Sequence, residues 1–413
     1  MSPTRSTDDF SGLGLAPKLL ATLDRLRFTT PTPIQLQAIP VAISGKDLIG
    51  IAQTGTGKTL AFGLPMLQRL AQVKGRGLII LPTRELAIQV DEMLHQIGRP
   101  LGLRTAVLIG GQSAKSQEQA LRRQPHIIVV TPGRLLDHLE QGTVRLNDIS
   151  ILVLDEADRM LDMGFAPQLN RILAKVPKQR QTMLFSATMP EDIVRIATKH
   201  MHLPLRVEVA PPGTAAAKVT HEVFVVEKSQ KTSLLTKLLG EYRGSVLAFT
   251  RTKHGAKKVT QALKHAGYNV AELHSNRSLG QRRDALEGFK TGKYRVLVAT
   301  DIAARGIDVT GIELVVNVDL PATPDDYIHR IGRTARAGRA GHAISFATPD
   351  QGRDLRAIER LLQKRLPVSR LPDLPPAPKF EPRPFVGPSA RPYGRPAHRR
   401  QRRPSNRYRR RWN

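Results

Sequence analysis

The chain lacks cysteine and long apolar runs. None of its 413 residues is cysteine, which excludes disulfide bridges, thiolate metal ligands and cysteine nucleophiles. No apolar run approaches the ~20 residues of a membrane span, and the first ten residues, MSPTRSTDDF, have no apolar core of the kind that a secretory signal needs. The sequence therefore predicts a soluble, cytoplasmic protein without a membrane partner.

Acidic residues are scarce relative to basic ones. The chain has 35 Asp and Glu against 64 Lys and Arg, a formal net charge of +29. An excess of this size favours a polyanionic partner, with nucleic acid as the first candidate and an anionic membrane surface as the second. The length also exceeds that of a usual single hydrophobic core, so two domains are expected.

Short apolar runs alternate with helix-length amphipathic stretches. Such alternation is typical of a parallel sheet covered by helices on both faces. The runs fall into two series, separated by a segment rich in Pro, Gly and Ala that indicates a linker. We therefore predict an α/β fold of two tandem domains, residues 1–209 and 219–368, joined by linker 210–218. The runs are DLIGIA, GLIILP, HIIVVTP, ILVLDEAD and TMLFSAT, then SVLAFT, YNVAELH, YRVLVATD, LVVNVDLP and AISFATP.

The pattern disappears from about Ser369. Residues 370–413 hold ten prolines and 13 Lys and Arg against two acidic residues, a net charge of +11. This composition predicts a disordered basic tail over residues 369–413. Its arginines can bind phosphates and its aromatic residues can stack on unpaired bases, which suggests an RNA tether. The alternative is a solubilising extension with incidental charge.

A glycine-rich segment, GIAQTGTGKT, follows an apparent strand and precedes a helical stretch. It fits the phosphate-binding P-loop except that Ala52 stands at the first Gly position. Gly55 and Gly57 let backbone amides turn toward phosphates, Lys58 supplies charge to the β- and γ-phosphates, and the Thr59 hydroxyl can bind Mg²⁺. A chance turn rich in Gly and Thr would not explain the flanking strand and helix, so we expect a nucleotide site.

Two carboxylates follow a buried run in LVLDEAD. Asp155 lies where an open α/β sheet places its ligands, at the carboxyl end of a strand, and could hold Mg²⁺ through water. Glu156 could orient or deprotonate the water that attacks the γ-phosphate. Alone, such a cluster is more often a solvated strand end, but a P-loop in the same domain favours the catalytic interpretation.

With these residues identified, the chain resembles the DEAD-box RNA helicases, because Asp155, Glu156, Ala157 and Asp158 spell the tetrad that names that family. The resemblance covers nearly all of residues 10–345, and it implies two tandem RecA-like domains that use ATP and Mg²⁺ to act on RNA. Its other elements are the Q motif (RFTTPTPIQ, 27–35), motif Ia (PTRELA, 82–87), the GG element (Gly110, Gly111), motif Ib (TPGR, 131–134), motif III (SAT, 186–188), motif IV (VLAFTRT, 246–252), motif V (ATDIAARGID, 299–308) and motif VI (HRIGRTARAGR, 329–339).

The resemblance implies a set of ATP-binding residues. A Gln carboxamide both donates and accepts hydrogen bonds, so Gln35 can recognise the edge of adenine. Phe28 and Phe10 are the candidates for packing on the base, although Phe10 could equally be a plain core residue. The full set is Phe10, Phe28, Gln35, Ala52, Gln53, Thr54, Gly55, Thr56, Gly57, Lys58, Thr59, Gly306 and Asp308.

The resemblance also assigns roles beyond the P-loop. Arg333 and Arg336 act as arginine fingers on the γ-phosphate, so the catalytic set of Lys58, Asp155, Glu156, Arg333 and Arg336 is complete only when the domains close. Asp158, Ser186, Thr188 and His329 couple RNA binding to hydrolysis. The resemblance further implies contacts with the sugar-phosphate backbone of one RNA strand, so little base specificity is expected. The contact residues are Arg84, Gly110, Gly111, Thr131, Arg134, Arg251, Arg282, Thr300 and Arg305.

Three positions depart from the family pattern. Leu279 replaces the usual Gln of a QxxR element that keeps Arg282, which puts a polar link near the RNA in doubt. Ala335 stands where Gly is commoner in motif VI, and Arg27 replaces the Gly before Phe28. None of these departures removes a catalytic group.

The expected function is that of an ATP-dependent RNA helicase that locally unwinds short duplexes or remodels RNA–protein complexes. Its compact core and short basic tail look most like the bacterial RhlE-type branch, which suggests ribosomal precursors or the RNA-decay machinery as partners. One alternative is an ATP-gated RNA clamp or scaffold. A second alternative, a DNA translocase, is disfavoured by the Q motif and the DEAD tetrad.

The tail generates a first prediction. Deleting residues 370–413 should weaken RNA binding and flatten its dependence on salt, because the deletion removes cationic phosphate contacts. RNA-saturated ATP turnover should remain nearly intact. RNA titrations of both proteins at several salt concentrations test this, and an unchanged affinity would refute the tether.

Overall fold

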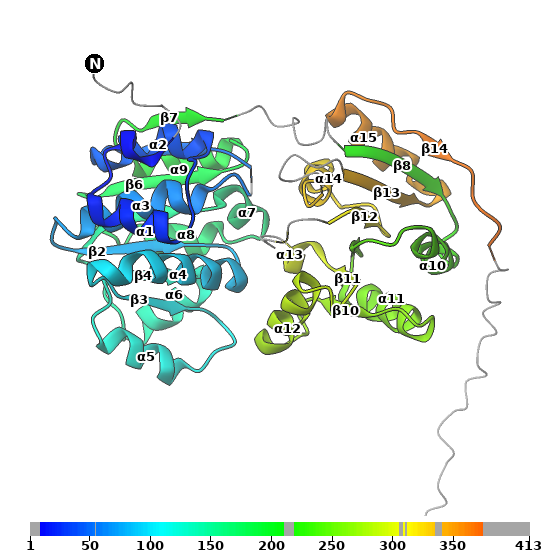
Figure 1. Ribbon diagram of the computed structural model, residues 1–413, viewed down its shortest axis with the longest axis horizontal. Coiled ribbons are helices and arrows are strands. Elements are labelled where there is room, and N and C mark those ends of the chain that lie inside the picture. The colour runs from blue at the N-terminus through cyan, green and yellow to red at the C-terminus, as the bar shows by residue number, and fades with distance from the viewer. Residues whose placement is uncertain are drawn as a thin grey trace, which may run out of the picture. The chain divides into compact units, whose positions relative to one another are not determined.

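Two parallel sheets form the framework of the protein (Figure 1). The computed structural model describes residues 9–53, 55–209, 219–304, 309, 312–334 and 341–374. Within them, the first seven-stranded sheet has the order β3-β4-β2-β5-β6-β1-β7 and the second the order β10-β11-β9-β12-β13-β8-β14. Every strand pair in both sheets is parallel. The predicted α/β fold with two parallel sheets is confirmed, whereas the predicted linker and nearly all of the tail lie outside the described residues.

The first sheet and its helices span Phe10 to Glu208. The strands are β1 (Leu48–Ile51), β2 (Arg76–Ile80), β3 (Thr105–Leu108), β4 (Ile127–Val130), β5 (Ile149–Leu154), β6 (Gln181–Ser186) and β7 (Leu205–Glu208). The helices are η1 (Phe10–Leu13), α1 (Pro17–Arg25), α2 (Pro33–Ile43), α3 (Lys58–Leu70), α4 (Arg84–Gly98), η2 (Arg99–Leu101), α5 (Ala114–Arg122), α6 (Pro132–Glu140), α7 (Ala157–Asp162), α8 (Ala166–Leu173) and α9 (Glu191–His200).

The second sheet and its helices span Val219 to Ser369. The strands are β8 (Val219–Val225), β9 (Val246–Phe249), β10 (Val270–Leu273), β11 (Val296–Ala299), β12 (Leu314–Asn317), β13 (Gly341–Ala347) and β14 (Val368–Ser369). The helices are α10 (Lys231–Glu241), α11 (Lys253–His265), α12 (Leu279–Lys290), α13 (Asp301–Ala304), α14 (Pro324–Ile331), η4 (Pro349–Gln351) and α15 (Gly352–Leu362).

Each face of the first sheet has its own apolar core. Side chains of a strand point alternately to the two faces. In β2, Leu78 and Ile80 therefore pack with helices α6 to α9, whereas Ile79 packs on the opposite face with α1 to α4. Each fully buried Leu or Ile contributes about 1.5–3 kcal/mol, so strands apolar at every position are stable only with helices on both faces.

Threonine–proline pairs begin three of the helices that carry motif residues. Thr32, Thr131 and Thr323 are the N-caps of α2, α6 and α14, and a proline follows each of them. Proline suits a first helical position because its fixed φ is already helical and its missing N–H would have no intrahelical partner. These pairs fix the residues at which the three helices begin.

Four strands carry no run of the kind on which the sequence prediction relied. β3 and β7 are the edges of the first sheet, β14 is an edge of the second, and β8 is its neighbour. Their residues alternate between buried and exposed or are largely exposed, as in β7, where only Val207 is buried. An edge strand is covered less completely than an inner strand, so β3, β7 and β14 do not need a continuous apolar run. β8 lies inside the sheet, but only four of its seven residues are buried.

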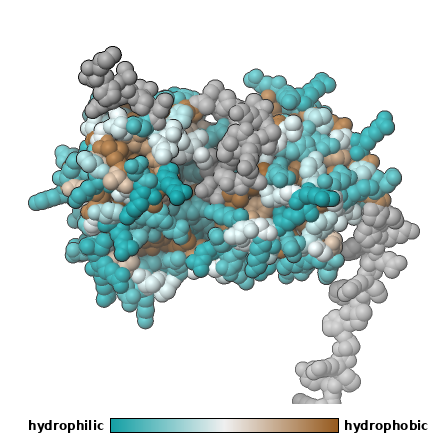
Figure 2. All heavy atoms as spheres, in the orientation of Figure 1, coloured by the Kyte–Doolittle hydropathy of each residue, from teal (hydrophilic) through white to brown (hydrophobic). Residues whose placement is uncertain are grey.

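Polar residues predominate on the face of the protein shown in Figure 2, where hydrophobic residues gather only in small areas. This agrees with the concentration of apolar side chains in the buried clusters. Among the described residues, no helix combines the length and apolarity that a bilayer crossing requires.

Gly50 generates a prediction about packing. A Cβ at this position of β1 would lie 2.5 Å from Cε1 of Phe185 in β6, closer than such atoms can approach. We expect Gly50→Ala to lower the free energy of unfolding of the first domain by about 1–3 kcal/mol through overpacking. Urea titration of the purified variant measures this change.

Gly240 provides the matched control for that substitution. It is exposed in α10, and a Cβ there would meet nothing within 4 Å. Gly240→Ala should raise the stability of the second domain by roughly 0.5–1 kcal/mol, because alanine restricts the unfolded chain. Equal effects of the two substitutions would contradict the packing argument.

Candidate ATP and RNA site

The P-loop connects β1 to α3 at the carboxyl edge of the first sheet. Gly55 and Gly57 adopt left-handed backbone conformations, with φ values of 87° and 91°, which side chains other than glycine adopt at a cost. Lys58 is buried at the start of α3, where its Nζ donates a hydrogen bond to the Ala52 carbonyl at 3.0 Å. The same ammonium lies 4.0 Å from Oδ1 of Asp155. The loop thus presents a cation beside the first DEAD carboxylate.

Gln35 joins the Q motif to the P-loop. Its Oε1 accepts a hydrogen bond from the Thr32 N–H at 2.9 Å, and its Nε2 donates one to the Gly57 carbonyl at 2.9 Å. A carboxamide has two N–H donors and two lone pairs on oxygen, so each polar atom keeps one further hydrogen-bonding position. A Cβ on Gly57 would clash with Nε2 of Gln35, which is a second reason for glycine there.

One cavity of about 490 Å³ joins the P-loop to the aromatic residues singled out in the sequence. Phe10 is 4% exposed and belongs to the core cluster that α1 to α4 share, and it also lines this cavity. Phe28 lines it as well and packs against the same cluster. Packing and base contact are therefore compatible for Phe10. The other lining residues include Thr32, Gln35, Gly55, Gly57, Lys58, Thr59, Asp155 and Glu156.

The DEAD tetrad forms the turn between β5 and α7. Asp155 is 4% exposed, and its Oδ1 accepts a hydrogen bond from the Glu156 N–H at 2.9 Å. Burial raises the pKa of the Asp155 carboxyl to about 6, while the nearby Lys58 ammonium acts in the opposite direction. Glu156 has a φ of 53°, an uncommon conformation for a residue with a side chain. Its carboxylate forms a buried ion pair with Arg159.

Asp158 links the tetrad to the SAT segment. Its Oδ2 accepts hydrogen bonds from the Ala187 N–H at 3.0 Å, the Thr188 N–H at 2.9 Å and the Thr188 hydroxyl at 3.0 Å. Its own N–H donates to the Ser186 hydroxyl at 3.3 Å. These four bonds fix the end of β6 against the start of α7, so three of the four residues expected to act in coupling, Asp158, Ser186 and Thr188, lie together.

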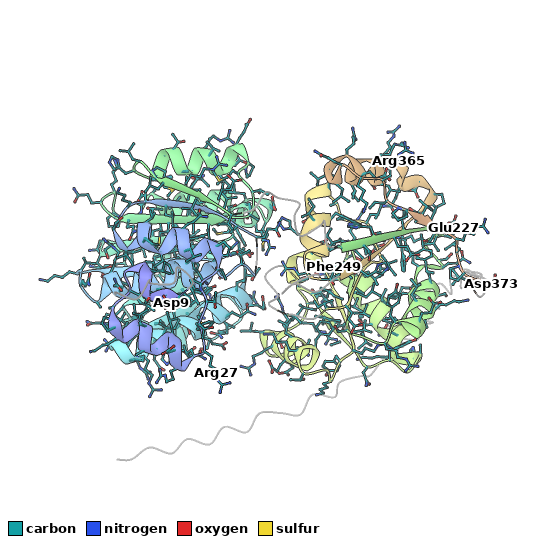
Figure 3. All side chains as sticks on the ribbon, turned by 45° about the horizontal axis from the view of Figure 1, so that its top comes forward. Asp9, Arg27, Glu227, Phe249, Arg365 and Asp373 are labelled. Carbon is teal, nitrogen blue, oxygen red and sulfur yellow. The ribbon has the colours of Figure 1, made fainter. Side chains whose placement is uncertain are left out.

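Arg330 organises the motif end of the second sheet. Its guanidinium pairs in two places with the Asp301 carboxylate, Nε to Oδ1 at 2.5 Å and Nη2 to Oδ2 at 2.7 Å. Nη1 donates to Asn317 Oδ1 at 3.1 Å and to the Asp319 carbonyl at 2.6 Å. The guanidinium also lies 5.0 Å from the ring centroid of Phe249, which Figure 3 labels at the end of β9. This planar fork connects motif VI to the ends of β9, β11 and β12.

Arg333 and His329 lie beside this anchor. Both contribute to a small cavity shared with Phe249, Asp301 and Arg330. Arg333 is 2% exposed, whereas His329 is half-buried. Arg333 therefore lies, with Asp301 of motif V, beyond the carboxyl ends of the strands of its own domain.

Comparisons with known proteins agree with this arrangement. The DEAD/DEAH box helicase family model matches residues 32–196, and the helicase conserved C-terminal domain model matches residues 230–338. An ATP-dependent rRNA helicase RRP3 from Debaryomyces hansenii is 43% identical over 88% of this chain and 77% of its own length. A DEAD-box ATP-dependent RNA helicase CshA from Geobacillus kaustophilus is 42% identical over 88% and 79%. The chain belongs to the DEAD-box family of ATP-dependent RNA helicases.

Solved structures of DEAD-box helicases match the fold of this one. S. cerevisiae Dbp5 bound to RNA and ADP BeF3 has a TM-score of 0.78 and 33% identity, over 87% of this chain and 96% of the other. Mss116p bound to ssRNA and AMP-PNP has a TM-score of 0.79 and 27% identity, over 88% of this chain and 78% of the other. These likenesses confirm two RecA-like domains in this DEAD-box helicase.

The first domain of the helicase gathers its predicted RNA residues at the ends of three neighbouring strands. Arg84 begins α4 after β2, Gly110 and Gly111 follow β3, and Thr131 and Arg134 follow β4. Gly111 has a φ of 80°, and a Cβ there would clash with the Arg84 guanidinium. Strand order therefore brings together residues up to 50 positions apart in the sequence.

The second domain carries three further predicted RNA residues within the described chain. Arg251 follows β9 and its Nη2 donates to the Leu320 carbonyl at 3.1 Å. Thr300 follows β11, and Arg282 lies in the first turn of α12. Five predicted site residues lie outside the described residues: Thr54, Arg305, Gly306, Asp308 and Arg336.

Two of the three departures from the family pattern have a described structure. Arg27 is exposed and has a φ of 61°, a conformation that glycine adopts without strain, which explains why glycine is the usual residue there. Its side chain extends outward from the first domain (Figure 3). Leu279 is the first residue of α12 and lies inside the capping box formed by Ser278 and Gln281. Ala335 lies outside the described residues.

Sequence reasoning missed two charged partners in the helicase. Arg159 pairs with Glu156, and Asp301 pairs with Arg330, yet neither stood among the predicted site residues. A usable signal existed for Asp301, which directly follows the run VLVAT just as Asp155 follows ILVL. For Arg159 the signal was its i+3 spacing from Glu156 on a helix.

The pKa of Asp155 generates a prediction about stability and pH. The value of about 6 lies above the ordinary 3.8, so the folded state binds the proton more tightly than the unfolded state. The resulting stabilisation is present below about pH 4 and is lost as the pH rises through about 6. We expect nucleotide-free Asp155→Asn to exceed wild type in free energy of unfolding by roughly 1–3 kcal/mol at about pH 8, with a smaller gap at about pH 5.

Urea titrations of wild type and Asp155→Asn at the two pH values measure this gap. Asp24→Asn, which changes an exposed carboxylate of α1, is the control for a general effect of removing a charge. A gap that stays constant between the two pH values, or that widens at the lower one, would contradict the prediction.

Proposed function

We propose that this RNA helicase hydrolyses ATP in the cavity over the P-loop. The main support is that P-loop residues, the carboxylates Asp155 and Glu156, and the aromatic residues Phe10 and Phe28 line one cavity. Lys58 holds the β- and γ-phosphates, Phe10, Phe28 and Gln35 hold adenine, and Glu156 orients the attacking water. Arg333 and Arg336 complete the charge stabilisation when the domains, 1–209 and 219–368, close across linker 210–218.

Magnesium is the proposed metal, held by Thr59 and by Asp155 through water. The donor set fits: a hydroxyl and a carboxylate oxygen are hard ligands of the kind that Mg²⁺ prefers. The raised pKa of Asp155 supports the assignment, because it indicates a buried carboxylate whose charge its protein neighbours only partly offset. When bound, the ion would neutralise phosphate charge.

RNA is proposed to run along Arg84, Gly110, Gly111, Thr131 and Arg134 in the first domain. In the second domain it would meet Arg251, Arg282, Thr300 and Arg305. Guanidinium groups and exposed backbone amides suit phosphate oxygens rather than base edges, so these contacts would position a strand without reading its sequence. Asp158, Ser186, Thr188 and His329 would relay RNA binding to the carboxylates.

Unwinding is proposed to be local. A ligand that drives a two-state equilibrium from 1:99 to 99:1 supplies about 5.5 kcal/mol of differential binding. One duplex step costs on the order of 1.4 kcal/mol on the DNA scale. One closure could therefore open only about four steps, which favours short duplexes and remodelling over long processive travel.

The RhlE-type branch, a cytoplasmic location and a role in ribosome assembly or RNA decay complete the proposal. The compact core followed by a short basic tail supports the branch. The match to a helicase described as acting on rRNA supports a ribosomal precursor as the substrate.

Glu156→Gln tests the proposed chemistry. Single-stranded RNA should strongly stimulate steady-state ATP hydrolysis by wild type, and the substitution should reduce the stimulated rate at least about 100-fold by removing the general base. Glu191→Gln, an exposed change at the start of α9, should leave the rate unchanged. Equal turnover by wild type and Glu156→Gln would refute the assignment.

Strand displacement separates the helicase from a clamp. Wild type should displace a short RNA strand with ATP, whereas Glu156→Gln should bind the same RNA without turnover. ATP-dependent binding by wild type without any displacement would instead favour the clamp.

A further inference from the structure

A buried polar network lies behind the GG element of the first domain. Gln117 of α5 and His138 of α6 are 2% and 1% exposed. Gln117 Nε2 donates a hydrogen bond to the Ile109 carbonyl at 2.8 Å, and its Oε1 lies 3.1 Å from His138 Nε2. His138 Nδ1 lies 2.7 Å from the Thr143 hydroxyl. The network thus joins two helices to the residue before Gly110.

Hydrogen-bond polarity fixes the protons in this network. The Ile109 carbonyl can only accept, so it must face the NH₂ group of Gln117, which leaves Oε1 as the acceptor toward His138. His138 must therefore carry a proton on Nε2. Burial lowers the pKa of this histidine, which favours the neutral ring with Nδ1 as an acceptor. The Thr143 hydroxyl lies 2.7 Å from Nδ1 and 3.1 Å from the His138 carbonyl, and with a neutral ring it directs its one proton to the closer Nδ1. Each bond in the chain then has one donor and one acceptor.

The residues on both sides of the GG element are hydrogen-bonded to groups that α6 carries or supports. On one side, Gln117 holds the Ile109 carbonyl while resting on His138 of α6. On the other side, Arg134 of α6 donates from Nη1 to the Gln112 carbonyl at 3.3 Å. Both hydrogen bonds end on backbone carbonyls that flank the glycine pair, so they act on the path of the main chain itself.

Glycine pairs need such support if their backbone is to bind a ligand. Gly110 and Gly111 offer a phosphate only their main-chain groups, and glycine loses more conformational freedom on ordering than any other residue. Ties that order the element before binding remove that cost from the binding step. We propose that Gln117 and His138 are positioning residues that hold the GG element against the TPGR helix for contact with the RNA backbone.

The burial pattern of α5 favours a positioning role for Gln117 over plain core packing. Gln117 is the one residue of this helix that is buried, so an amide rather than an apolar side chain forms its most buried contact with the domain. A buried polar pair generally stabilises a fold no better than apolar side chains of similar volume, but its directional bonds specify one geometry. The proposal rests on the assignment of RNA to this surface.

Gln117→Leu, His138→Leu and His138→Gln test the proposal. The measured quantity is the RNA concentration that half-saturates ATPase stimulation, with the KM for ATP and the RNA-saturated kcat determined in parallel. Both Leu variants should raise this half-saturating RNA concentration, called the RNA value below, about tenfold, since they leave a buried carbonyl or amide without its partner. They should change the KM for ATP and the kcat by less than about twofold. His138→Gln, which keeps a donor near the position of Nε2, should restore the RNA value to within about threefold of wild type.

Gln181→Leu is the matched structural control. Gln181 is also a buried Gln whose Nε2 holds backbone carbonyls, those of Ala42 and Lys46, each at 2.8 Å. It begins β6 and therefore lies at the opposite edge of the sheet from the motifs. This variant should lose stability like Gln117→Leu without shifting the RNA value.

Arg134→Ala distinguishes failure of this inference from failure of the RNA assignment. If Arg134→Ala raises the RNA value and Gln117→Leu raises it no more than Gln181→Leu, the positioning role is wrong and the RNA surface stands. If Arg134→Ala has no effect, the surface assignment and the inference both fall. If Gln117→Leu does not fold, the contrast between His138→Leu and His138→Gln decides, and equal RNA values for the two would overturn the proposal.

Discussion

Parallel strand pairing is the constraint on which the rest of this helicase depends. Parallel strands all end at one edge, so each connecting segment that carries a motif leaves the first sheet on the same side. Strand order then divides that edge. The neighbours β5, β6 and β1 bring the DEAD, SAT and P-loop segments together, and the neighbours β3, β4 and β2 bring together the GG, TPGR and PTREL segments. The strand order thus places the proposed nucleotide residues on one half of the edge and the proposed RNA residues on the other.

The polar groups beyond the carboxyl ends of the strands, in both sheets, differ in how many of their hydrogen bonds and charges the protein satisfies. Asp158 accepts three hydrogen bonds, and Arg330 binds two carbonyl-type oxygens and a carboxylate, so both hold segments in place. Asp155 is different, because burial keeps its pKa raised despite the nearby Lys58 ammonium. An incompletely compensated carboxylate costs stability, and such a cost is expected where a cation and phosphates are to be bound. The extent of this compensation therefore distinguishes Asp158 and Arg330, which hold segments in place, from Asp155, the proposed magnesium ligand.

Much of this arrangement could be predicted from the sequence, for identifiable reasons. Inner strands are buried on both faces, so runs such as ILVL and HIIVV marked them, and P-loop residues have a fixed local spacing. Edge strands such as β7 gave no run because only Val207 is buried. The left-handed backbone of Glu156 has no local signature in the residue type. Gln117 and His138 are 21 positions apart in the sequence, and their contact depends on the pairing of β3 with β4, which no periodicity in α5 or α6 indicates.

The two halves of the edge meet at the neighbouring strands β2 and β5, where a main-chain hydrogen bond links them. The Asp155 N–H donates to the carbonyl of Ile80, the last residue of β2, at 3.1 Å. From Ile80 the chain passes through Leu81, Pro82 and Thr83 to Arg84 at the start of α4. A sheet hydrogen bond is short and directional, so a displacement of the PTREL segment that reached Ile80 would also change the position of Asp155. The turn with the proposed catalytic carboxylates and the segment with the proposed RNA contact are therefore joined by this hydrogen bond, and a strand order that separated β2 from β5 would remove it.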